Sequence, residues 1–325
     1  MKYMFLTILH NLKIESILNK GINIYSGTRI SNGNGVLQRT IFSNLLRSTA
    51  GVHSTDEFIN KVYYYKIGEF TDVVTKEEMD TRGSMTTFHF LREAEQFVHS
   101  LWMTKDNNVY IRDGFLIVYE DDLEQGFTYK ASLTTIYSAS SGSELESSFS
   151  KEEVIDAISY FTPFTLEEMK AENFGGKYLT NNHFYKSSQQ TRFDRALYFV
   201  AAARAAGAPP MKIVSYCTAL ECLFTTDKSE VVHKIAERTA TLLGNSGENK
   251  REIFNFVKKA YGLRSTVIHG ALIKGNDHDL ISVTTGLDDI LRRIIKHEDH
   301  EVFSIEEKEL DNYFLSMLFN YGGGL

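Results

Sequence analysis

An arginine and a histidine near the end of one predicted helix have the residue types and spacing for acid–base chemistry on a phosphate. Arg264 and His269 stand five positions apart in the segment YGLRSTVIHG, residues 261–270. Histidine titrates near neutral pH, so its imidazole can serve as a general acid or a general base. Arginine keeps its charge and donates parallel hydrogen bonds to phosphate oxygens. The pair could therefore move a proton and stabilise negative charge on a phosphate.

Two further side chains are candidates to support this pair. Ser265 directly follows the arginine and can both donate and accept a hydrogen bond. Glu221 interrupts the otherwise apolar segment ALECLF, and a carboxylate among apolar side chains needs a polar partner, so we expect Arg264 to meet it. A purely structural interpretation also exists. In it, Arg264 only neutralises Glu221, His269 only caps a helix C-terminus, and Ser265 is solvated or packed.

The spacing of Arg264 and His269 is common, so their place in the fold has to distinguish them. Four to six residues also separate the arginine and histidine of five other pairs in the chain. Arg264 falls late in a predicted helix over Lys250–His269, and Gly270 is predicted to end that helix. The other helices predicted for the C-terminal half are Lys151–Phe161, Thr191–Ala206, Pro209–Thr225, Glu230–Leu243, Leu280–Lys296 and Ile305–Phe319.

The links between these helices and the sequence before them predict two different domains. Short polar links favour an antiparallel helical bundle, whose first helix opens with a capping box formed by Ser150 and Glu153. The stretch Asn173–Gln190 is predicted to be a loop. The N-terminal half instead contains one predicted helix, Leu91–Trp102, among runs typical of strands. These runs are Tyr3–Leu9, Gly21–Ser31, Val62–Ile67, Asn108–Arg112 and Gly114–Tyr119.

The predicted fold class is therefore α+β. A mixed α/β domain over residues 1–148 precedes a mainly helical domain over residues 149–325, and the serine-rich stretch Ser138–Ser150 marks the boundary. The net charge of −7 argues against non-specific coating of nucleic acid. It leaves room for a local basic surface, because residues 250–275 contain six lysines and arginines against one acid, a net charge of +5.

The cysteines and the apolar runs indicate a compartment. Cys217 and Cys222 are five residues apart on a predicted helix, where they point about 140° apart and do not pair with each other. We therefore expect a reducing compartment. No apolar run reaches the roughly 20 residues that a membrane span needs. We expect a cytoplasmic protein without a membrane partner.

The order of three segments in the C-terminal half resembles a known family. A helix with ALECLF, a helix with VVHKIAERTATLLG and a helix end with Arg-x4-His-Gly follow one another between residues 219 and 270. This order is similar to the Apea-like branch of the HEPN superfamily, a family of bacterial defence and toxin ribonucleases. The resemblance covers roughly residues 190–320. Many members have Asn, Asp or His directly after the arginine, where this chain has the shorter Ser265.

The resemblance implies a function. It implies a metal-independent endoribonuclease, a hydrolase of the antiviral-defence or toxin type, that cleaves RNA by attack of the 2′-hydroxyl. Arg264 and His269 would be catalytic, Glu221 and Ser265 supporting, and no metal or cofactor would be needed. Arg264 and His269 lie about 140° apart around one helix, and the family solves this mismatch with a homodimer in which two motifs share one cleft.

Three hypotheses remain open from the sequence. The first is the RNA-cleaving homodimer, with residues 1–148 sensing a phage or host trigger. The second is a non-catalytic HEPN-like module that binds RNA, a nucleotide or a protein partner. The third is a structural dimer. The cluster His297–Glu301 resembles a metal site, but at a helix end it is interpreted as a solvated run of charges.

Overall fold

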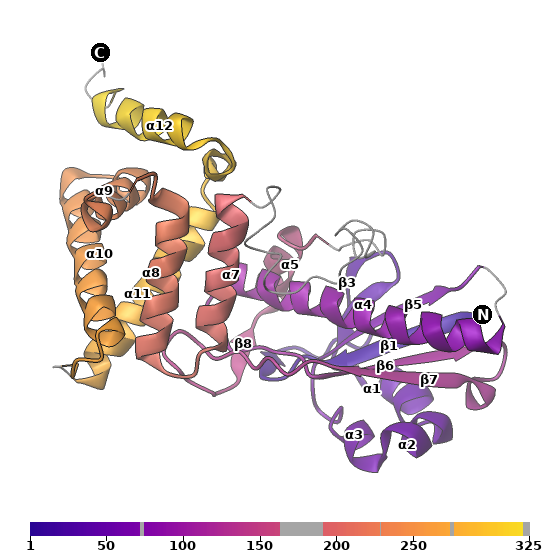
Figure 1. The fold of residues 1–325 in the computed structure, drawn as a ribbon. Coiled ribbons are helices and arrows are strands. Elements are labelled where there is room, and N and C mark those ends of the chain that lie inside the picture. The colour runs from indigo at the N-terminus through magenta and orange to yellow at the C-terminus, as the bar shows by residue number, and fades with distance from the viewer. Residues whose placement is uncertain (72–74, 163–190, 228, 274–275, 321–325) are drawn as a thin grey trace. The chain divides into compact units, whose positions relative to one another are not determined.

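The computed structural model describes residues 1–71, 75–162, 191–227, 229–273 and 276–320 (Figure 1). The chain has the predicted α+β class, with an N-terminal sheet unit and a C-terminal helical unit. The predicted loop at Asn173–Gln190 lies outside the described residues. No helix within the described ranges is both long enough and apolar enough to cross a membrane.

The N-terminal unit is built on a six-stranded antiparallel sheet in the order β3-β4-β5-β1-β6-β7. Its strands are β1 (Lys2–Ile8), β3 (Ile22–Tyr25), β4 (Thr28–Ser31), β5 (Tyr63–Glu69), β6 (Asp113–Tyr119) and β7 (Phe127–Ser132). A separate parallel pair joins β2 (Leu12–Ile14) to β8 (Ser147–Phe149). The predicted strand Asn108–Arg112 was wrong: within it only Tyr110 forms a bridge, to His10.

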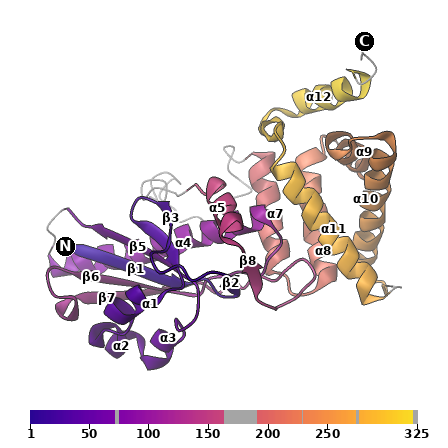
Figure 2. The ribbon, with the colours of Figure 1, turned by 180° about the vertical axis from the view of Figure 1, so that it is seen from behind.

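Helices cover both faces of this sheet (Figure 1, Figure 2). Alternate residues of each strand point to opposite faces, so Phe5 and Tyr64 join the core beneath one layer while Leu6 and Tyr63 join the other. One layer is the long helix α4 (Lys76–Thr104). The other comprises α1 (Asn34–Val36), the turn Leu37–Ile41, α2 (Asn44–Ala50) and α3 (Val52–Asp56), and the turn Leu123–Gln125 precedes β7.

The C-terminal unit contains six of the seven helices predicted for the C-terminal half, together with a 3₁₀ turn. They are α7 (Arg192–Ala205), α8 (Pro209–Phe224), α9 (Val231–Leu243), α10 (Gly247–Ile268), α11 (Asp277–Ile295), the 3₁₀ turn His300–Ser304 and α12 (Glu307–Asn320). Links of three residues join α7 to α8 and α9 to α10, and both pairs pack together. Helix α8 is central, because it packs against α7, α10 and α11 and buries Ile213, Tyr216 and Leu220 completely.

The boundary between the units differs from the predicted division at residue 148. Helix α5 (Lys151–Ser159) opens with the predicted capping box, since Ser150 Oγ accepts from Glu153 N at 3.2 Å. It belongs, however, to the N-terminal unit, where Val154 and Ala157 are buried in the core beside α4. The segment Ser138–Ser143 belongs to the helical unit. The capping box predicted that a helix begins after Ser150, but it did not specify which core that helix would join.

Candidate functional site

Helix α10 carries the predicted Arg-His pair, and its inner face is anchored to the centre of the helical unit. Ser246 caps its start, with Oγ accepting from Asn249 N at 3.2 Å. Ile253, Val257 and Ala260 are buried along the inner face. Near the other end, the Tyr261 hydroxyl donates to the Cys217 carbonyl of α8 at 2.9 Å. The C-terminal part of α10 is therefore held against α8 by a buried hydrogen bond as well as by apolar packing.

This anchoring brings Arg264 to Glu221, as the sequence predicted. Nη2 of Arg264 lies 3.3 Å from Oε1 and 3.5 Å from Oε2 of Glu221. The two side chains are 30% and 27% exposed, so solvent reaches the pair from one side. Burial raises the pKa of the Glu221 carboxyl above its ordinary value, although Arg264 and a hydrogen bond with Tyr261 act in the opposite direction. Glu221 therefore holds the Nη2 side of the guanidinium, while Nε is a buried donor without a partner among the described residues.

His269 stands at the exposed end of the same helix. It is the capping residue directly after Ile268, the last residue of α10, and its backbone N–H donates to Ser265 O at 3.1 Å. Gly270 follows with a φ of +67°, a conformation that side chains other than glycine's rarely adopt. Gly270 N donates to Val267 O at 3.1 Å and Ala271 N donates to Thr266 O at 3.0 Å, which together form a Schellman motif. The predicted stop at Gly270 is confirmed.

The His269 imidazole makes no hydrogen bond or ion pair with any described residue, and the residue is exposed. Ser265 is also exposed, one helical turn before it. Arg264 instead faces α8, because positions 264 and 269 are separated by about 140° around the helix axis. A single chain thus directs its arginine and its histidine to different sides of α10.

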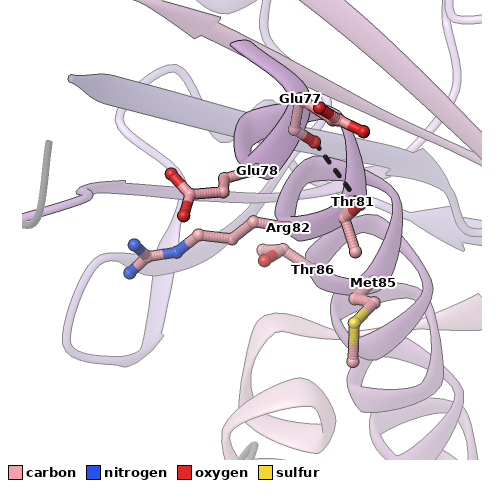
Figure 3. Close-up of a pocket in the computed structure, with 6 residues that line it drawn as sticks. All are labelled: Glu77, Glu78, Thr81, Arg82, Met85 and Thr86. Atoms are coloured by element: carbon pink, nitrogen blue, oxygen red, sulfur yellow. Dashed lines mark hydrogen bonds between the residues drawn. The ribbon is translucent and has the colours of Figure 1, made fainter. Parts of the chain in front are cut away.

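One depression lies far from this pair in the sequence, on the first turns of α4 (Figure 3). Arg82 lies over the Phe70 ring, 4.6 Å from its centroid, and Glu78 is occupied by the capping box with Thr75. Thr81 Oγ1 donates to the Glu77 carbonyl at 3.4 Å. The six lining residues all come from this one helix: Glu77, Glu78, Thr81, Arg82, Met85 and Thr86. Their polar groups do not converge on a point, so we place no chemistry there.

The cluster His297–Glu301 follows α11. His297 Nδ1 accepts from Asp299 N at 3.2 Å, and Asp299 accepts from the Tyr313 hydroxyl at 3.0 Å. The His300 ring packs against Phe193 with 5.7 Å between centroids. In the part of the chain that the structure describes, no three histidine, cysteine or acidic side chains are grouped to hold a metal. The two cysteines are free, Cys217 buried and Cys222 partly buried.

Sequence reasoning missed a polar clamp at the C-terminal end of α8. Arg192 donates to the Thr225 carbonyl at 2.5 Å, and Arg238 donates to the Phe224 carbonyl at 2.6 Å. Each arginine is also paired with an acid of α12, Arg192 with Glu307 and Arg238 with Asp311. These cations satisfy carbonyls that a helix end leaves without partners. The signal for it in the sequence is an arginine at position 238, among the residues that α9 buries.

A second buried polar network lies in the N-terminal unit. Glu93 of α4 is 1% exposed and accepts from Lys66 Nζ at 2.8 Å and from the Tyr64 hydroxyl of the sheet. Lys66 also lies over the rings of Tyr25 and Phe90, 4.7 and 4.4 Å from their centroids. Burial, with the nearby Glu93, raises the pKa of the Tyr64 hydroxyl well above its ordinary value. The network joins the helix to the sheet and presents no open face for a ligand.

Comparisons with known proteins do not extend this description: no family model matches the chain, and neither the curated proteins nor the solved structures gave a significant match.

Proposed function

We propose that the chain is a metal-independent endoribonuclease of the HEPN type, acting in the cytoplasm as a defence or toxin effector. The observation that carries the proposal is the combination at the end of α10. Arg264 is fixed by Glu221, while the His269 imidazole is exposed and engaged by no described residue. An anchored cation and an available titratable ring are the two groups that phosphodiester cleavage by the 2′-hydroxyl requires.

In the proposed reaction, one proton leaves the 2′-hydroxyl and another is delivered to the 5′-oxygen. A His269 imidazole takes the proton of the 2′-hydroxyl, whose oxygen then forms a bond to phosphorus. The bond from phosphorus to the 5′-oxygen breaks, and that oxygen receives a proton from a protonated imidazole. The products are a 2′,3′-cyclic phosphate and a 5′-hydroxyl. Arg264 stabilises the charge on the non-bridging oxygens, and Glu221 keeps its guanidinium oriented.

A homodimer supplies what one chain lacks. One imidazole does not serve as base and acid on opposite sides of a phosphorus in a single step, and the arginine of the same chain faces away from it. A two-fold contact at the end of α10 would bring two copies of His269 and two of Arg264 together. Ile268 and Leu272 support this contact, because they are apolar side chains, 51% and 91% exposed, beside the pair. The N-terminal unit would sense the phage or host trigger.

A non-catalytic module that binds RNA, nucleotide or protein is the second candidate. It is favoured by Ser265, which is shorter than the residues common at that position, and by the net charge of −7. In this alternative, the ion pair between Arg264 and Glu221 serves only to stabilise the helical unit.

Incubation of the purified protein with total RNA, with and without EDTA, tests the proposal. We expect cleavage in both conditions, with fragments ending in 2′,3′-cyclic phosphate. The His278→Ala variant is the matched control, since His278 is an exposed histidine at the start of α11, and it should cleave like wild type. RNA that stays intact with the wild-type dimer, while the protein still binds it, would replace the nuclease with the binding module.

A further inference from the structure

The outer face of α10 combines residues that usually bind a single nucleic-acid strand. The helix lies at the edge of the helical unit in both views (Figure 1, Figure 2). At about 100° per residue, positions separated by steps of three or four residues fall within a narrow stripe along a helix. Six residues of α10 and its end follow this spacing and form what we call the α10 stripe: Arg251, Phe254, Lys258, Gly262, Ser265 and His269.

The two cations of the α10 stripe are available to a ligand. Arg251 and Lys258 are exposed, and neither forms an ion pair with any described residue. Two acids of the same helix lie near Arg251: Glu248, three residues before it and about 60° away around the axis, and Glu252, about 100° away. The α10 stripe itself contains two cations and no acid. The stripe is therefore locally positive on a chain whose net charge is −7. Two exposed cations without ion-pair partners attract the phosphates of a nucleic acid.

Phe254 provides a flat apolar surface between these cations. It is partly exposed, and Lys258 Nζ lies 5.4 Å from its ring centroid. The His233 ring of α9 packs nearly perpendicular to it, with 5.3 Å between centroids and an interplanar angle of 76°. This contact between the two rings holds the orientation of Phe254. Unpaired bases stack on aromatic rings supported in this way, whereas paired bases are not available for stacking.

No packing contact inside the helical unit explains why position 262 is a glycine. A glycine in a helix interior costs about 1 kcal/mol relative to alanine. Gly286 of α11 has a packing reason, because a Cβ there would lie 2.4 Å from the Phe256 ring. At Gly262 a Cβ would meet nothing within 4 Å. The missing side chain instead lowers the surface of the α10 stripe between Lys258 and Ser265, where an external chain could approach the helix backbone.

We infer that the α10 stripe is the binding track for a stacked single strand of RNA that leads to His269. The inference rests on the proposed function for its substrate, and it adds the form in which the substrate is bound. From Arg251 to His269 the helix spans about 27 Å at 1.5 Å per residue. At roughly 3.4 Å per stacked nucleotide, that length holds about eight nucleotides. A second copy of the chain is the less favourable occupant, because a two-fold contact through this stripe would face positive charge with positive charge.

Binding of a labelled 12-nucleotide 2′-O-methyl oligouridine, measured by fluorescence anisotropy at several salt concentrations, tests the track. This probe binds as RNA but has no free 2′-hydroxyl, so cleavage does not disturb the measurement. The double variant Arg251→Ala/Lys258→Ala should bind more weakly, with the slope of log affinity against log salt reduced by about 1.4. The control Lys20→Ala/Lys308→Ala removes two exposed lysines outside α10 and should keep the wild-type slope.

The variant Phe254→Leu separates stacking from charge. It keeps an apolar side chain but removes the flat ring, so affinity should fall about fivefold or more while the salt slope stays unchanged. Circular dichroism should show wild-type helix content in each variant. Two results would overturn the track: wild-type affinity in both α10 variants, or a changed dimer dissociation constant with unchanged RNA affinity. A protein that shows these binding effects but cleaves nothing would refute the proposed nuclease and retain the track.

Discussion

Glu221 and Arg264 face each other across the contact between α8 and α10, with 3.3 Å between Oε1 and Nη2. The pair is less than a third exposed, and the Tyr261 hydroxyl is bonded to α8 beside it. Arg264 is thus oriented by its own chain, while His269 is not. This asymmetry determines how the two residues should respond to substitution.

His269→Ala should abolish RNA cleavage and leave the fold nearly unchanged. The exposed position at the end of α10 makes no side-chain contact that the fold depends on, so the loss in unfolding free energy should be about 1 kcal/mol or less. The rate should fall about 10²-fold or more, because general acid–base catalysis contributes at least that much. Single-turnover cleavage and urea denaturation measure the two effects. Equal rates for wild type and variant would remove His269 from the mechanism.

Arg264→Ala should lower both activity and stability, because it leaves the carboxylate of Glu221 partly buried without its partner. Adding Glu221→Gln should recover part of the stability but none of the activity. In a double-mutant cycle, the coupling free energy between the two positions should be roughly 0.5–1 kcal/mol, given that solvent screens the pair. Urea denaturation of the four proteins gives this value. Purely additive effects would mean that the ion pair does not orient Arg264.

The raised pKa of Glu221 predicts a pH dependence of stability. At pH values just above 4.5, the ordinary pKa of this carboxyl, Glu221 keeps its proton more in the folded state than in the unfolded state. The unfolded state then binds fewer protons, so the unfolding free energy falls as pH rises through the window just above 4.5. Glu221→Gln lacks this titration. The stability of the variant minus that of wild type should therefore increase from pH 4 to pH 7, and a decrease would contradict the assigned direction.

Leu272→Asp should convert the proposed dimer to a monomer and abolish cleavage. Leu272 is 91% exposed next to the end of α10, and a charge there would disfavour an apolar two-fold contact. Light scattering at micromolar concentration measures the mass. Leu145→Asp is the control, because Leu145 is 82% exposed in the N-terminal unit and should leave mass and activity unchanged. An active monomer of either variant would defeat the composite site.

The clamp on α8 should contribute to stability through Arg238 more than through Asp311. Arg238 is 8% exposed and donates to the Phe224 carbonyl, so Arg238→Ala removes a buried donor and should cost about 2–3 kcal/mol. Asp311 is 41% exposed, and Asp311→Asn should cost about 1 kcal/mol or less. Urea denaturation compares the two variants. A larger loss of unfolding free energy for Asp311→Asn than for Arg238→Ala would contradict this. It would show that the ion pair stabilises α12 more than the hydrogen bond stabilises the C-terminal end of α8.

Local features of the helical unit could be predicted from the sequence alone. The end of α10 follows from Gly270, since only a glycine adopts the backbone of a Schellman motif without strain. The capping box at Ser150 involves residues three apart and needs no tertiary contact. The meeting of Glu221 and Arg264 was predictable because a carboxylate on an apolar helix requires a polar partner, and α10 offered a cation.

Other features depended on contacts between distant segments. Helix α4 begins at Lys76, well before the predicted Leu91, although its first turns contain Gly83 and several threonines of low helix propensity. Packing explains the difference, because a Cβ at Gly83 would lie 2.3 Å from Tyr129 of β7, so the glycine lets the strand approach the helix. Neither residue alone reveals this contact.

The two residues of the candidate site, Arg264 and His269, also differ in what the sequence and the tertiary structure each determine. Sequence spacing determined that Arg264 and His269 would lie on different sides of one helix, since the helix repeat depends only on backbone geometry. Only the tertiary structure decided that α8 would cover the arginine and leave the histidine and the α10 stripe exposed. Burial depends on which helices pack together, and here that packing joins residues more than forty positions apart, such as Tyr261 and Cys217, whose sequence separation is 44.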